Sequence, residues 1–258
     1  MNDVLLTAST EGELIYWHAK SGKVFHKINE SGAVFLSLDY SKDGEIFAVG
    51  GEDKILRIYD ENMKIITHKY NSGSNYSPGH KSRINSVCFH KNDKTGNYSN
   101  LLVSGGWDQR VIIYDTRTNK ICGTIFGPYI CGDSLDLKDH ILLTGSFYPD
   151  SNIELWDLRN YKLLDPLILS DSDLKMNIYS SQFSKIRGCN FIGIGGANSN
   201  NFRIYDVDLN EKERNKQMSY YASTKYLEKP CYNLDFANKK KMVAFGGGDG
   251  NIRIINYD

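Results

Sequence analysis

The chain has 258 residues, of which 40% are apolar and 24% charged, and its 31 basic residues balance 31 acidic ones. A chain without net charge has no overall field that would draw it to nucleic acid or to an anionic surface, so we expect neither nucleic-acid binding nor membrane insertion. No apolar run approaches the roughly 18 residues of a transmembrane helix. The five cysteines form no C-x-x-C motif, and no signal peptide is visible, so we expect a cytoplasmic location.

A hairpin pattern recurs along the whole chain. Its clearest copy is Leu101 to Asp115, where two runs rich in β-branched and aromatic residues flank a Gly-Gly-Trp-Asp-Gln turn. The second run of each copy ends in an aromatic residue, which Asp follows in four copies. The aligned positions are Trp17, Tyr59, Tyr114, Trp156, Tyr205 and, with the aromatic lost, Ile255. They lie roughly 40 to 55 residues apart, which indicates a structural repeat.

The segments between the hairpins supply two further predicted strands per repeat. Those before the hairpins are Val34–Asp39, Ile84–Phe89, Tyr179–Phe183, Cys231–Phe236 and a weaker one around Asp133–Leu137. Those after the hairpins are Lys23–Ile28, Ile65–Tyr70, Ile121–Phe126, Leu163–Leu169 and Met218–Ala222. No helical periodicity interrupts them. Each full repeat is therefore predicted to be four short antiparallel strands.

A four-stranded unit of about 40–50 residues that ends in an aromatic residue and Asp is typical of a propeller blade. The sequence resembles the WD-repeat family through YWH, IYD, IYD, LWD and IYD, and through Gly79-His80 ahead of the third repeat. The resemblance implies an all-β WD-repeat β-propeller of four-stranded antiparallel blades, forming a single domain over residues 1–258. The repeats fall at about 1–30, 31–70, 80–127, 128–170, 176–223 and 229–258.

The same resemblance assigns structural roles to polar residues of the third repeat. It places His80 before the first strand, Ser104 on the second, Asp108 in the turn and Tyr114 where Trp is usual. Together they can form a hydrogen-bonded chain that ties the turn to the blade interior, since buried polar groups are stable when all are paired. The fourth repeat keeps part of this set: Thr144, Asp150 and Trp156.

The two ends of the pattern leave the ring incomplete. The chain enters at the second strand of the first repeat and leaves at the third strand of the last, so a ring of six or seven blades lacks strands. Three explanations stay open: further strands are unrecognised, the chain is part of a longer one, or a partner supplies the missing edge. An unpaired edge strand invites pairing with another chain.

Aromatic and basic residues in the predicted loops are the candidates for partner binding. Trp107 lies in the turn of the third repeat and Tyr148 in the longer, corresponding turn of the fourth, while Tyr76, Tyr129 and Arg83 stand at or before first strands. In the family these turns gather on one face around the central channel. Exposed Trp, Tyr and Arg anchor protein interfaces. The alternative is that each ring folds against its own blade.

No catalytic, cofactor or metal site is expected. The stretches Gly193–Asn198 and Gly246–Asp249 are interpreted as hairpin turns, because no helix follows that could bind a phosphate. Cys88 and His90 share one face of a strand, but no second pair stands at ligand spacing. No nucleophile stands beside a base, so an enzyme with its site at the channel mouth is the least favoured hypothesis.

The function predicted from these features is a non-catalytic scaffold or adaptor that presents propeller faces to partner proteins or peptides within a multiprotein complex. The alternative is a structural subunit of a larger cytoskeletal, axonemal or coat assembly, held by the incomplete edge and the sides of the blades.

Overall fold

The computed structural model describes residues 4–71, 79–91, 93–94, 96–148, 153–164, 176–186, 188–207, 219–224 and 227–257. These residues form strands and turns, with no helix among them. In the described part there is accordingly no helix that is long and apolar enough to cross a membrane. Tyr76 and Asp150, two of the predicted site residues, lie outside the described residues.

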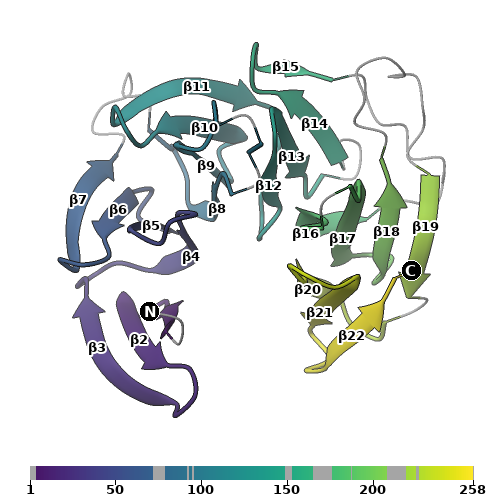
Figure 1. Cartoon of the computed structure of the whole chain (residues 1–258), viewed down its shortest axis with the longest axis horizontal. Helices are drawn as coiled ribbons and strands as arrows, with labels where there is room; N and C mark the ends of the chain where they lie inside the picture. Colours follow the sequence, from purple (N-terminus) through teal and green to yellow (C-terminus); the bar gives the residue numbers. More distant parts are fainter. Residues whose placement is uncertain are drawn as a thin grey trace.

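Six antiparallel sheets follow one another in chain order (Figure 1). The first holds β1 (Val4–Ala8), β2 (Glu13–His18) and β3 (Lys23–Asn29), and the second β4 (Phe35–Tyr40), β5 (Ile46–Gly51), β6 (Leu56–Asp60) and β7 (Ile65–Tyr70). The third holds β8 (Ile84–Phe89), β9 (Leu101–Gly106), β10 (Arg110–Asp115) and β11 (Lys120–Phe126).

The second half of the chain repeats this arrangement. The fourth sheet holds β12 (Leu135–Lys138), β13 (Ile141–Gly145), β14 (Ile153–Asp157) and β15 (Lys162–Leu163), and the fifth β16 (Asn177–Phe183), β17 (Phe191–Ala197), β18 (Phe202–Asp206) and β19 (Ser219–Thr224). The last sheet holds β20 (Cys231–Phe236), β21 (Met242–Gly247) and β22 (Ile252–Asn256).

The sheets stand around a common centre as the blades of a propeller, with β4, β8, β12, β16 and β20 innermost (Figure 1). Neighbouring blades pack chiefly through these inner strands. The apolar core lies between blades: Ala48 and Ile58 of the second blade form one buried cluster with Ile84 and Val87 of the third. The middle strands are covered on both faces, which explains their nearly continuous apolar sequences. The predicted all-β propeller is confirmed.

In the structure the paired glycines lie within strands and not in the turns. Gly195 and Gly196 lie within β17, and Gly246 and Gly247 end β21, so the prediction that these stretches are wholly turn residues is wrong. A middle strand is buried against blades on both sides, and glycine allows the backbone of the neighbouring strand to come close. The turns themselves begin only after the second glycine of each pair.

The ring is open. The first and last blades have three strands each, and they stand at the two ends of an arc (Figure 1). In the described part of the chain, β1 pairs only with β2, and β22 only with β21. Apolar side chains are exposed on these terminal blades: Leu5 is 54% exposed, Ile252 82% and Ile254 63%. Six blades are therefore present, the outermost two incomplete.

Candidate functional site

A buried hydrogen-bond network ties the turn of the third blade to its interior. The Nδ1 atom of His80 lies 3.1 Å from the Asp108 carboxylate, and its Nε2 atom lies 2.7 Å from Ser104 Oγ. Ser104 in turn donates to the Tyr114 hydroxyl at 3.2 Å. The backbone N–H of Lys81 donates to Asp108 at 2.7 Å, so the carboxylate holds the chain before β8 as well. The four side chains serve the architecture of the blade.

Other blades keep shorter versions of this network. The Trp156 indole N–H donates to Thr144 Oγ1 at 3.1 Å in the fourth blade, and the Trp17 indole donates to Thr7 Oγ1 at 2.9 Å in the first. Each bond joins a middle strand to the strand before it. In these blades the aromatic residue near the end of the third strand of the repeat therefore links two strands by a hydrogen bond. Trp107 lies at a different position, directly after β9, and makes other contacts.

Trp107 lies directly after β9, where its ring is 39% exposed. The Arg83 guanidinium carbon stands 4.1 Å from the centre of this ring, a cation–π contact. Glu52 of the second blade holds Arg83 through an ion pair of 2.5 Å. The Arg83 guanidinium thus lies over the indole ring of its own blade, and Glu52 of the neighbouring blade fixes its position.

The rings of the fourth blade continue from Trp107. Tyr129 stacks on Trp107 with ring centroids 6.0 Å apart, and Tyr148 follows at 4.7 Å from Tyr129. Ser146 orders this segment, because its Oγ accepts backbone N–H bonds from both Tyr129 and Tyr148 at 3.3 Å. Four of the five binding residues predicted from sequence, Trp107, Tyr148, Arg83 and Tyr129, are therefore brought together on the third and fourth blades.

Three aromatic residues that the sequence did not single out extend the series. Phe147 lies 6.3 Å from Tyr129, Tyr179 of the fifth blade 5.4 Å from Phe147, and Tyr232 of the last blade 5.1 Å from Tyr179. We call this set the aromatic row, and its members are Trp107, Tyr129, Phe147, Tyr148, Tyr179 and Tyr232. The row crosses four consecutive blades, and Tyr148 and Tyr232 are each 47% exposed.

Two members of the row stand at β-bulges. The pairing register shifts between Ile178 and Ser180 in β16 and between Cys231 and Asn233 in β20, so Tyr179 and Tyr232 are the unpaired residues. A bulge re-aims the side chain of its extra residue. The bulges thus place Tyr179 beside Phe147 and Tyr232 beside Tyr179, which simple strand alternation would not do.

The hydroxyl groups of the row are available. In the described part of the chain, no hydrogen bond joins the hydroxyl of Tyr129, Tyr148, Tyr179 or Tyr232 to another protein group. Burial raises the pKa of Tyr129 and of Tyr179 above the ordinary value, so these phenols keep their protons at neutral pH. They can therefore donate hydrogen bonds outward.

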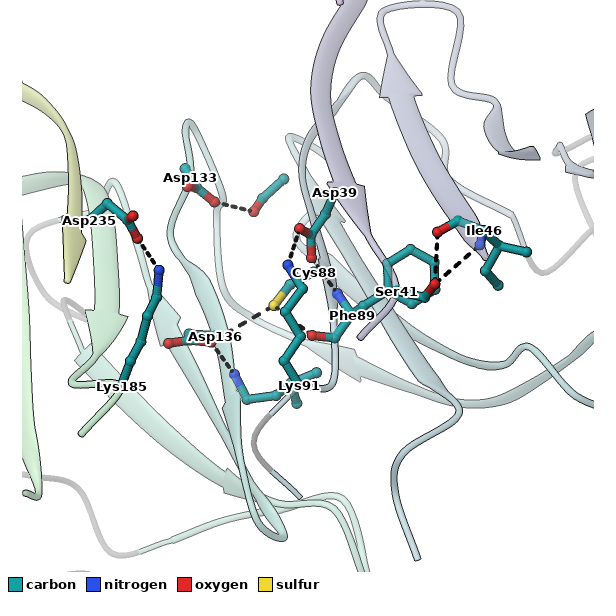
Figure 2. Close-up of polar contacts among 12 residues, drawn as sticks. Asp39, Ser41, Ile46, Cys88, Phe89, Lys91, Asp133, Asp136, Lys185 and Asp235 are labelled. Carbon is teal, nitrogen blue, oxygen red and sulfur yellow. Dashed lines mark hydrogen bonds and ion pairs between the residues drawn. The ribbon is translucent and has the colours of Figure 1, made fainter. Parts of the chain in front are cut away.

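A second set of polar residues lies further along the inner strands, three positions after the bulge residues Tyr179 and Tyr232 in the last two blades. Asp39, Cys88, Asp136, Gln182 and Asp235 hold equivalent register positions in successive blades. We call them the polar belt, and Figure 2 shows four of them at the centre of the propeller. Lys91 pairs with Asp39, and Lys185 pairs with Asp235 (Figure 2).

Members of the belt join each blade to the next. Asp39 accepts a 2.8 Å bond from the backbone N–H of Phe89, and Asp136 accepts one of 2.8 Å from that of Phe183. Gln182 accepts the Phe236 N–H at 3.0 Å. In each case a side chain of one inner strand accepts a hydrogen bond from a backbone N–H of the following blade. These bonds fix the angle between neighbouring blades. The belt is therefore structural.

Burial of the belt perturbs its acids. Enclosure raises the pKa of Asp136 to about 6, although N–H bonds from Phe183 and Leu137 oppose the rise. Asp133, next to the belt, has its pKa raised to about 7 by burial and by the nearby charges of Asp39, Asp136 and Asp235. The described residues include no group of three or more His, Cys, Asp or Glu side chains placed to hold a metal ion. His90 instead lies with Nε2 2.6 Å from the Asp139 carbonyl.

Comparison with known proteins agrees with this architecture. Residues 22–60 and 73–115 match the family described as WD domain, G-beta repeat. The chain is 26% identical over 163 residues to a guanine nucleotide-binding protein subunit beta of Nicotiana tabacum, an alignment that covers 60% of this chain and 42% of that protein. The corresponding subunit of Zea mays is 24% identical over 163 residues, with 60% and 41% covered.

The aligned region thus spans less than half the length of these relatives. The matched repeats include the third blade, whose His80, Ser104, Asp108 and Tyr114 form the complete network. The aromatic-Asp strand ends recur in the blades on either side of it. Two stretches of the chain are thus similar to WD repeats, and the fold of the described residues is the WD-repeat β-propeller that the sequence resemblance implied.

Proposed function

We propose that this propeller is a non-catalytic scaffold that binds partner proteins or peptides through the aromatic row. The observation that carries the proposal is the continuity of the row: six rings from four blades contact one another in series, and three of them are at least 39% exposed. Isolated exposed rings are common on protein surfaces, whereas a contiguous series marks a place where a partner binds.

The row has the features of an interface anchor. Trp, Tyr and Arg contribute most to binding energy when a partner shields them from water. The side chains are held in advance by stacking, by the Ser146 bonds and by the Arg83–Glu52 pair. Little side-chain entropy is therefore lost when a partner binds, which favours affinity.

The relatives support a role in an assembly. Their names describe subunits of guanine nucleotide-binding proteins, which act as parts of multisubunit complexes. A cytoplasmic scaffold within a multiprotein complex fits both this similarity and the balanced charge of the chain. The open ring favours a second candidate, a structural subunit joined to its neighbours through Leu5, Ile252 and Ile254 of the terminal blades.

The test removes two exposed anchors of the row. Trp107→Ala with Tyr148→Ala should reduce recovery of cross-linked partners from cells by about tenfold or more, because two hot-spot residues are lost together. Phe126→Ala with Met63→Ala is the matched control, since these side chains are 66% and 60% exposed and lie outside the row. Equal recovery by the two double variants, with both still folded by circular dichroism, would show that the binding face lies elsewhere.

A further inference from the structure

We propose that the ligand of the aromatic row is a proline-rich segment in the polyproline II conformation, supplied by a partner protein. This inference rests on the proposed function and names the chemistry of the partner. It is drawn from three properties of the row: the pairing of its bordering charges, its surplus of hydrogen-bond donors, and the spacing of its rings.

Two charged groups that border the row, Arg83 and Asp249, are paired within the chain. Arg83, which lies over Trp107, is paired with Glu52 at 2.5 Å. At the other end Tyr232 packs near Gly248, and the next residue, Asp249, is paired with Arg253 at 2.6 Å. A charged ligand would have to compete with these existing pairs. The row therefore favours an uncharged segment.

The tyrosine hydroxyls of the row have no hydrogen-bond partner among the described residues and are free to donate outward. Among the described residues, the hydroxyls of Tyr129, Tyr148, Tyr179 and Tyr232 donate to no protein group. A proline-rich segment is the complementary ligand, because proline has no backbone N–H while its carbonyl remains free to accept. A helix satisfies its own carbonyls, and a β-strand brings an N–H for every carbonyl. Neither matches a surface that offers mainly O–H donors and ring faces.

The geometry of the row also matches. Successive ring centroids stand 4.7 to 6.3 Å apart. Two such steps set an upper limit on the distance between alternate rings, and this limit admits the roughly 9 Å between residues i and i+3 of a polyproline II helix, which present one face. Pyrrolidine rings on that face can then pack between alternate aromatic rings. Aromatic-lined grooves bind proline-rich segments in this way, and a preformed helix loses little entropy.

The first experiment measures binding of a fluorescein-labelled oligoproline of about ten residues by anisotropy, with a glycine-serine peptide of equal length as the comparison. We expect the oligoproline to bind with a dissociation constant in the micromolar range and the glycine-serine peptide to bind at least tenfold more weakly. Added salt should change the oligoproline affinity less than twofold, because no charges are exchanged.

The second experiment separates the hydroxyls from the rings. Tyr179→Phe with Tyr232→Phe keeps the rings and removes two donors, and should weaken oligoproline binding about five- to fiftyfold. Tyr221→Phe is the control, since Tyr221 is an exposed tyrosine of β19 that packs on Phe191, outside the row. Binding that is absent from the wild-type chain, or equal in all three proteins, overturns the inference.

The two proposals fail separately. If oligoproline does not bind, yet Trp107→Ala with Tyr148→Ala abolishes partner recovery, the row is a binding face for another chemistry and only the inference falls. The opposite outcome is that oligoproline binds, that Tyr179→Phe with Tyr232→Phe weakens this binding, and that partner recovery is unchanged by Trp107→Ala with Tyr148→Ala. In that case the proposed role of the row in partner binding is wrong.

Discussion

Asp133 is an exposed and Asp136 a half-buried carboxylic acid at the inner strands, and their raised pKa values make the centre of the propeller sensitive to pH. Three elements present four acids to one another here: Asp39 from β4, Asp133 and Asp136 from the β12 segment, and Asp235 from β20. Ser86 Oγ lies 3.4 Å from Asp133 Oδ1, so this donor stabilises the carboxylate only weakly. Protonation of Asp133 relieves its repulsion from the neighbouring carboxylates.

We predict that Asp133→Asn flattens the pH dependence of stability. The ordinary pKa of an aspartate is 3.8, whereas that of Asp133 in the folded protein is about 7. Between these values the folded chain holds a proton that the unfolded chain has lost, so stability falls as pH rises from about 4 to about 7. Above that range the charged Asp133 lowers stability by about 1 kcal/mol or less, because water screens an exposed carboxylate.

The measurement is the melting temperature at about pH 5 and about pH 8. The wild-type protein should lose about 2–4 °C or less over this interval through Asp133, at about 2–4 °C per kcal/mol for a domain of this size. Asp133→Asn should lose less and should melt higher than the wild type at the upper pH. Asp206→Asn, at the exposed end of β18, is the control and should keep the wild-type slope. A slope unchanged by Asp133→Asn contradicts the prediction.

Some residues of the aromatic row could be predicted from the sequence, and others could not. Trp107 and Tyr148 were identifiable because they follow a predicted strand, in turns where other repeats have small or polar residues. Tyr179 and Tyr232 were not, because each stands in a stretch that reads as a regular inner strand. Their inclusion in the row depends on bulges, whose positions are set by pairing with β17 and β21. Strand periodicity contains no signal for that pairing.

At the scale of the element, the second glycine of each pair lets an inner strand start close to its neighbour. A Cβ atom on Gly106 would lie 2.0 Å from the Arg83 carbonyl oxygen, and one on Gly247 would lie 1.9 Å from that of Pro230. Hydrogen bonds run through the same carbonyls, from Trp107 N to Arg83 and from Gly248 N to Pro230. The close approach therefore positions the residue that follows the glycine.

We predict that Gly247→Ala is much more damaging than Gly246→Ala. The first change forces a methyl group onto a backbone carbonyl and should cost at least about 1–3 kcal/mol of unfolding free energy, the usual range for overpacking. A Cβ on Gly246 meets its nearest atom, the Asn251 oxygen, at 3.3 Å, and should cost under about 1 kcal/mol. Urea unfolding of the two variants measures the difference. Equal midpoints would mean that the strand shifts freely at this point.

Strands in which apolar and polar residues alternate regularly could be predicted from the sequence. The β12 segment, which carries Asp133 and Asp136, was predicted only as a weak strand. The sequence predicts a weak strand around Asp133–Leu137, whereas β12 spans Leu135–Lys138. Asp133 and Asp136 interrupt the apolar pattern, and their positions depend on bonds from Ser86 and Phe183 of neighbouring blades. The predicted strand Leu163–Leu169 begins within the described residues as β15, while its later part lies outside them.

At the scale of the whole molecule, the open ring exposes apolar side chains that blades normally bury against each other. Ile252 and Ile254 alternate along β22 and are 82% and 63% exposed, on a strand with a free edge. Such a face tends to associate. The sequence indicated the missing strands from the repeat pattern, but which side chains become exposed depends on how the first and last blades stand.

We predict that Ile252→Lys with Ile254→Lys reduces self-association without unfolding the chain. Sedimentation of the wild-type protein should give an average mass that rises with concentration, whereas the double variant should remain monomeric. Both should unfold at similar urea concentrations, since exposed side chains contribute within about 0.5 kcal/mol. Met63→Lys, which adds a charge at a residue 60% exposed in a turn, is the control. A wild-type chain that is monomeric at all concentrations contradicts the prediction.

Because the ring is open, we expect its two terminal blades to unfold locally more readily than the middle blades. In a closed circle every blade has two neighbours, so no blade can unfold first without breaking two contacts. Here the blades form a line in which the first and last have a single neighbour each, and stability is close to a sum of nearest-neighbour interactions. Backbone amides should therefore exchange fastest in β1–β3 and β20–β22 and slowest in the third and fourth blades. Part of the aromatic row, from Trp107 to Tyr148, lies in that slow-exchanging middle, while Tyr232 lies on a blade that opens more readily.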